Sequence, residues 1–93
     1  MIYIKLKKHL ADLEDIEQQK PQQERRKVPS LRAIAGEIGK SYAAISRIAN
    51  NHVSGIRFET ADAIIETVRR QGFQMDLTDL ITYVPKGESN AQG

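Results

Sequence analysis

Few residue types in this sequence could carry out covalent or metal-dependent chemistry. The 93 residues include no cysteine and only two histidines, His9 and His52. A thiol nucleophile, a disulfide and a thiolate metal site are therefore excluded, and no metal-ligating partner stands near His52. We expect His52 to be a hydrogen-bonding loop residue and His9 to face solvent from a helix. The sequence predicts no enzyme, no metal site and no cofactor.

The spacing of residues 31–48 is more informative. Ser30 and Ser41 can each cap the first turn of a helix, and Gly39 can take the left-handed conformation of a tight turn. The small Ala35 lets two helices approach each other. This spacing favours a helix-turn-helix, a DNA-binding motif, over a generic helical hairpin. The two expected buried faces are Leu31, Ile34, Ala35 and Ile38, and then Ala44, Ile45, Ile48 and Ala49.

Apolar residues at helical spacing predict three further helices, over residues 5–17, from 58 to about 70, and after 75. Residues 1–4 and 82–84 are rich in β-branched and aromatic side chains, and we expect them to pair as a small two-stranded β ribbon. The fold is thus expected to be all-α with five helices. The expected buried faces are Leu6, Leu10, Leu13 and Ile16; Phe58, Ala61, Ile64, Ile65 and Val68; and Met75, Leu77, Leu80 and Ile81.

We expect one domain over residues 1–85 and a disordered tail over 86–93, because 93 residues are too few for two cores. No apolar run approaches the about 20 residues of a membrane helix, and together with the absence of cysteine this favours a cytoplasmic protein without a membrane span.

The net charge is only +2, but basic residues gather in the middle of the chain, roughly over residues 20–47. This distribution is typical of a protein with one basic face toward a polyanion, although a solvated loop and an ordinary helix surface would give the same count. Residues 18–28 are almost wholly polar and predict an exposed basic loop. Its Arg25, Arg26 and Lys27 could contact a DNA backbone or minor groove, or could simply be solvated.

The motif also resembles, nearly position by position, that of the Cro- and phage-repressor-like (XRE) helix-turn-helix family of transcriptional regulators. The resemblance implies a five-helix lambda-repressor-like DNA-binding domain. Two departures are Lys40, where the family usually has an apolar turn residue, and the long loop over 18–28. The matching residues are Ser30-Leu31-Arg32, Ala35, Gly39, Ser41-Tyr42 and Ile45-Ser46-Arg47-Ile48 with Asn50, followed by residues 58–68 and 79–85.

The resemblance places a recognition helix over residues 41–50 and assigns base reading to Tyr42, Ala43, Ser46 and Arg47. Arg47 is the first candidate for a bidentate guanine contact, with an ion pair to Glu37 or a phosphate contact as alternatives. Tyr42 could instead cover the helix junction. Helix N-termini and loops commonly bind phosphate. The phosphate-binding candidates are Ser30, Arg32, Lys40, Ser41, Asn50, Asn51, His52 and Arg57.

The sequence thus predicts a transcriptional regulator that binds specific sequences of double-stranded DNA. One short recognition helix reads few base pairs, so we expect a homodimer on a two-fold site, with residues 75–84 and the terminal ribbon as the dimer surface. The alternative is an antitoxin-like autoregulator that also binds a partner protein through its tail or its long loop.

Overall fold

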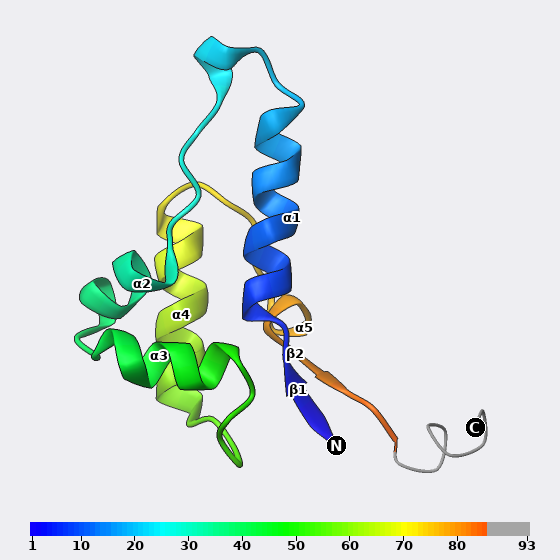
Figure 1. The fold of residues 1–93 in the computed structure, drawn as a ribbon, viewed down its shortest axis with the longest axis vertical. Helices are drawn as coiled ribbons and strands as arrows, with labels where there is room; N and C mark the ends of the chain where they lie inside the picture. The colour runs from blue at the N-terminus through cyan, green and yellow to red at the C-terminus, as the bar shows by residue number, and fades with distance from the viewer. Residues whose placement is uncertain (86–93) are drawn as a thin grey trace.

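Residues 1–85 are described by the computed structural model, and they form five α-helices and a two-stranded sheet (Figure 1). The expected tail over 86–93 lies outside the described residues. The predicted five helices and terminal ribbon are confirmed. The elements are β1 (Ile2–Ile4), α1 (Leu6–Gln18), the single 3-10 turn η1 (Gln22–Glu24), α2 (Leu31–Ile38), α3 (Tyr42–Ala49), α4 (Phe58–Arg70), α5 (Leu77–Leu80) and β2 (Ile81–Tyr83).

The two strands join the beginning of the described chain to its end. They are antiparallel, and Ile2 lies opposite Tyr83 while Ile4 lies opposite Ile81. Backbone hydrogen bonds extend the ladder at both ends, from the Val84 N–H to the Met1 carbonyl (2.7 Å) and from the Lys5 N–H to the Leu80 carbonyl (2.6 Å). The ribbon therefore fixes α1 beside α5, which directly precedes β2 (Figure 1).

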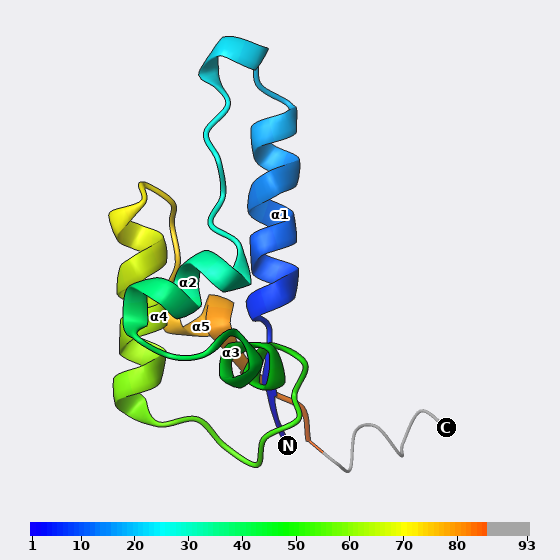
Figure 2. The ribbon, with the colours of Figure 1, turned by 60° about the vertical axis from the view of Figure 1, so that its left-hand side comes forward.

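The helices α2 and α3 begin and end where the sequence predicts. The Ser30 hydroxyl accepts a hydrogen bond from the Ala33 N–H, and the Ser41 hydroxyl accepts one from the Ala44 N–H, both at 3.1 Å. Gly39 follows α2 with a φ of 74°, a left-handed conformation that glycine adopts without strain. The short turn brings α3 back across α2, and α2 also packs on α4 (Figure 2).

The core lies between α1, the α2–α3 pair, α4 and α5. Its largest fully buried side chains include Ile34 of α2, Ile45 of α3, Ile64 of α4 and Leu80 of α5. Leu6 of α1 is also fully buried in this core. A chain of this size has only one such core, so each helix depends on the others for its position.

Three apolar residues expected in the core are instead largely exposed, namely Ile16, Phe58 and Leu77. Phe58 and Leu77 are the first residues of their helices, before either helix reaches the core. In α1 the next buried residue after Leu13 is Glu17, four residues later, and not Ile16.

His9 also differs from its prediction of facing solvent. Its side chain is largely buried, with Nε2 2.8 Å from the Gln74 carbonyl oxygen and Nδ1 3.9 Å from a carboxylate oxygen of Asp79. The loop before α5 therefore covers this part of α1, which the periodicity of α1 alone does not indicate.

The loop over residues 18–28 is attached to the fold by the buried carboxylate of Glu17, which is only 4% exposed. Glu17 accepts hydrogen bonds from Lys20 Nζ (2.8 Å), the Arg26 backbone N–H (2.7 Å) and the Arg26 guanidinium (3.2 Å). Arg26 also donates to the Gly72 carbonyl (2.6 Å) and lies 4.4 Å from the centroid of the Phe73 ring. The basic side chains at positions 25–27 of this loop are exposed, as expected, but the loop is held to the fold at Arg26 and at the buried Val28.

These donors lower the pKa of Glu17 from 4.5 to about 2, with Lys20 contributing most and the Arg26 backbone N–H next. A carboxyl whose pKa is lower in the folded state stabilises the fold above its unfolded pKa, and this stabilisation disappears as the pH falls toward the folded value. We expect Glu17→Gln to melt at a lower temperature than the wild type at pH 7, and the difference to shrink between about pH 4.5 and about pH 2.

Thermal melts followed by circular dichroism at several pH values measure this difference. The exposed Glu14 on the same helix supplies the matched control, because Glu14→Gln removes the same charge without these donors. A difference between Glu17→Gln and the wild type that does not change with pH would contradict the role of the ionised carboxylate.

Candidate nucleic-acid interface

The four predicted base-reading residues share the side of α3 that faces away from the core. Tyr42, Ala43 and Arg47 are exposed and Ser46 is partly exposed. Positions i, i+1, i+4 and i+5 of a helix lie on one face, whereas Ile45 and Ala49 point inward and are buried. The structure therefore brings this set together on the exposed side of α3, and we call these four residues the polar strip.

Arg32 of α2 lies next to this strip. Its guanidinium carbon is 4.4 Å from the centroid of the Tyr42 ring, a cation–π contact between the first turns of α2 and α3. Tyr42 thus packs at the helix junction, one of the two alternatives that the sequence left open. The contact also holds a positive charge beside the N-terminus of α3.

A hollow of about 250 Å³ lies on the other side of Arg47, between α3 and the start of α4. Three basic side chains line it, from three different segments: Lys40 in the α2–α3 turn, Arg47 in α3, and Arg57 immediately before α4. We call these three residues and their hollow the cationic hollow. Within residues 1–85 none of the three forms an ion pair, and Glu37, considered as a partner of Arg47, lies 3.8 Å from Arg70 instead.

The start of α4 adds to the positive potential of the cationic hollow. Arg57 is the residue before the helix, and no side chain accepts a hydrogen bond there as a cap. The first backbone N–H groups of a helix lack partners within it and carry a partial positive charge. Thr60, in this first turn, is one of the lining residues.

Two predicted phosphate-binding residues have structural roles. Asn50 donates to the Ser46 carbonyl (2.8 Å) and accepts a hydrogen bond from Lys7 Nζ (3.0 Å). The Asn51 amide pairs with the backbone of Ile4 like a neighbouring strand: its oxygen accepts from the Ile4 N–H (2.7 Å) and its nitrogen donates to the Ile4 carbonyl (3.1 Å). We call this pair of hydrogen bonds the Asn51 clamp.

The remaining predicted DNA-contacting residues lie in two loops, one after α3 and one after α1. His52 is exposed, and its side chain forms no hydrogen bond within residues 1–85, contrary to the predicted role as a loop hydrogen-bonding residue. Arg25 donates to the carbonyls of Lys20 and Gln18 at the end of α1. The loop over residues 18–28 follows the end of α1 that lies away from α3 (Figure 2), so the structure does not bring Arg25 and Arg26 to the polar strip. Lys27 follows in the same loop, and its side chain is exposed.

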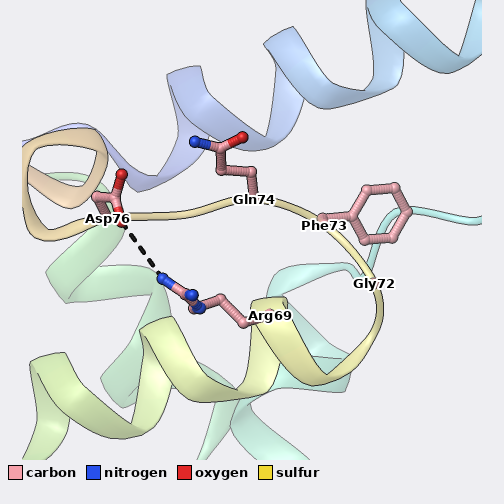
Figure 3. A pocket seen from close by; sticks show the side chains of 5 residues that line it. All are labelled: Arg69, Gly72, Phe73, Gln74 and Asp76. Carbon is pink, nitrogen blue, oxygen red and sulfur yellow. Dashed lines mark hydrogen bonds and ion pairs between the residues drawn. The ribbon is translucent and has the colours of Figure 1, made fainter.

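A further hollow, of about 420 Å³, lies at the C-terminal end of α4 and was not expected from the sequence (Figure 3). Its two charged residues face each other: a guanidinium nitrogen of Arg69 lies 3.3 Å from a carboxylate oxygen of Asp76. Phe73 and Gln74 also line it. Because its charges pair with each other, this hollow attracts an anion less than the cationic hollow does.

No family model, curated protein or solved structure matches this chain. Inferences about its function therefore rest on its own residues. Over residues 1–85, no cluster of three or more histidines, aspartates and glutamates could hold a metal ion. No helix of the same part of the chain is long and apolar enough to cross a membrane.

The Asn51 clamp yields a test of stability. Asn51 has a φ of 61°, where alanine is strained and glycine is not. We expect Asn51→Ala to lower the free energy of unfolding by about 3 kcal/mol, and Asn51→Gly by about 2 kcal/mol, because both lose the two hydrogen bonds but only alanine adds backbone strain. Urea unfolding measures both. Wild-type stability in either variant would contradict the clamp.

Proposed function

We propose that this chain is a sequence-specific DNA-binding transcriptional regulator of the helix-turn-helix type, which places α3 in the major groove and acts as a homodimer. The observation that carries the proposal is the polar strip of α3, bordered on both sides by basic residues. An α-helix fits the major groove, and basic residues beside it contact the phosphates along the groove edges.

The arrangement of charges supports this function. Arg32 borders the strip on the α2 side, and Lys40 and Arg57 border it on the α4 side. Phosphates flank the major groove on both sides, so cations on both sides of a helix suit a duplex better than they suit a single small anion. Arg47 is exposed and free of ion pairs within the described chain, so its guanidinium can donate two hydrogen bonds to a guanine edge.

The cap geometry also supports the proposal. The Ser30 and Ser41 hydroxyls are at the N-termini of α2 and α3, and these two serines are among the positions that resemble the XRE family. Phosphate oxygens bind well at helix N-termini, where backbone N–H groups and the helix dipole act together. In this proposal α2 sits across the backbone while α3 enters the groove.

The direct test is selection of bound DNA from a random-sequence pool, followed by affinity measurements on the selected site. We expect Arg47→Ala to lower affinity for the selected site about 10- to 100-fold and to relax the preference at one base position. The matched control is Arg69→Ala, which removes an equal charge from a side chain paired with Asp76. Failure of the wild type to enrich any sequence would overturn the proposal.

Lys40 serves a different purpose in this proposal, since it contacts phosphate rather than a base. We expect Lys40→Gln to weaken binding to selected and unselected DNA by similar factors. The slope of log K against log salt concentration should also fall by about 1, because one fewer counterion is released. Titrations at several salt concentrations measure the slope, and an unchanged slope would remove Lys40 from the interface.

A further inference from the structure

An apolar groove lies between the β ribbon, the loop after α3 and the start of α4. Its volume is about 260 Å³. Most of its walls are hydrocarbon, in contrast to the cationic hollow nearby. Six of the residues that line it are Ile2, Ile4, Val53, Phe58, Leu77 and Ile81.

Large apolar side chains stand at the rim of this groove. Phe58 is 90% exposed, Ile2 61% and Leu77 53%. Tyr83, 66% exposed, lies directly opposite Ile2 in the ladder and therefore on the same face of the ribbon. None of these four side chains belongs to the buried core, and Phe58 is the most exposed large apolar residue of the described chain.

The apolar area of this face is a large part of what a stable interface buries on one partner. With about 200 Å² for a fully exposed large side chain, the four rim residues alone expose on the order of 500 Å². The partly exposed Val53, Ile56 and Ile81 in the groove add to this area. A standard-size interface buries roughly 800 Å² on each partner, so this face could supply most of one.

The volume of the groove and the exposed ring of Phe58 together indicate what could bind in the groove. A cavity of about 150 Å³ can hold a benzene molecule, so the groove has room for one phenyl ring. Phe58 borders the groove but does not fill it, because its side chain is 90% exposed. Two copies related by a two-fold axis would each offer one ring and one groove, which is the self-complementary arrangement of a symmetric dimer.

We propose that this face binds a second copy of the chain, with Phe58 of each copy inserted into the apolar groove of the other. The inference deepens the proposed function and rests on it for the choice of a second copy as the occupant. Residues 86–93, Lys-Gly-Glu-Ser-Asn-Ala-Gln-Gly, contain no large apolar side chain and suit the groove poorly. The contact leaves the polar strip free, because Tyr42, Ala43, Ser46 and Arg47 do not line the groove.

Sedimentation equilibrium of the full chain without DNA tests this contact. We expect a concentration-dependent dimer for the wild type and a dissociation constant at least about 30-fold higher for Phe58→Asp, the effect of losing a central interface residue. Leu77→Asp tests the same face from α5 and should also weaken the dimer. The control is Ile16→Asp, because Ile16 is an exposed apolar residue of α1 that does not line the groove, and it should leave the dimer intact.

Circular dichroism of each variant verifies that it is folded, and Phe58→Asp should keep the wild-type spectrum because its side chain is 90% exposed. A wild type that stays monomeric at all concentrations would overturn the inference, as would equal weakening by Ile16→Asp. The result is independent of DNA binding. A monomer that still selects a DNA sequence would leave the proposed function standing, whereas a dimer that selects none would leave only the dimer contact standing.

Discussion

Burial of Ile45 and Ala49 fixes the rotation of α3 about its own axis, and the polar strip depends on that rotation. A shift of one residue would turn the helix by about 100° and would exchange the strip for apolar side chains. The rotation is held at the start of α3 by the Ser41 cap and the turn at Gly39, and at its end by the Asn51 clamp. The proposed readout of DNA thus rests on a few buried contacts that touch no ligand.

The Asn51 clamp also connects the two faces on which the proposals rest. The polar strip belongs to α3, and the apolar groove is lined by β1 and the loop that follows α3. Asn51 lies between them, since it follows α3 directly and holds the backbone of Ile4. The loop residues Val53, Gly55 and Ile56 line both the apolar groove and the cationic hollow. Packing in one of these hollows therefore affects the walls of the other.

Local signals in the sequence predicted most of the fold. Helical spacing located all five helices, and single residues with strong backbone preferences, Ser30, Gly39 and Ser41, located the ends of α2 and α3. The outward set on α3 followed from the same periodicity. What the sequence did not reveal depends on contacts between distant residues. Glu17 is buried because Arg26 and Lys20 neutralise it, and nothing in the pattern of α1 indicates those partners.

In the candidate site, too, local structure was predicted correctly and contacts between distant residues were not. Asn50 and Asn51 have the composition of a phosphate-binding loop, but their amides bond to Lys7, Ser46 and Ile4. Ile4 lies 47 residues from Asn51 in the sequence and belongs to β1, which pairs with β2 near the end of the described chain. Phe58 fits the apolar period of α4 but precedes the part of that helix that meets the core, so periodicity could not separate it from the buried positions.

Pairing of residues 2–4 with residues 81–83 has a consequence for synthesis of the protein on the ribosome. The first strand emerges early, but it has no partner until residue 83 has left the exit tunnel, so the ribbon forms only after α1 to α5 have been made. Ile2, Ile4 and Ile81 line the apolar groove, which is therefore completed last. A nascent chain therefore lacks the finished groove until residue 83 has emerged.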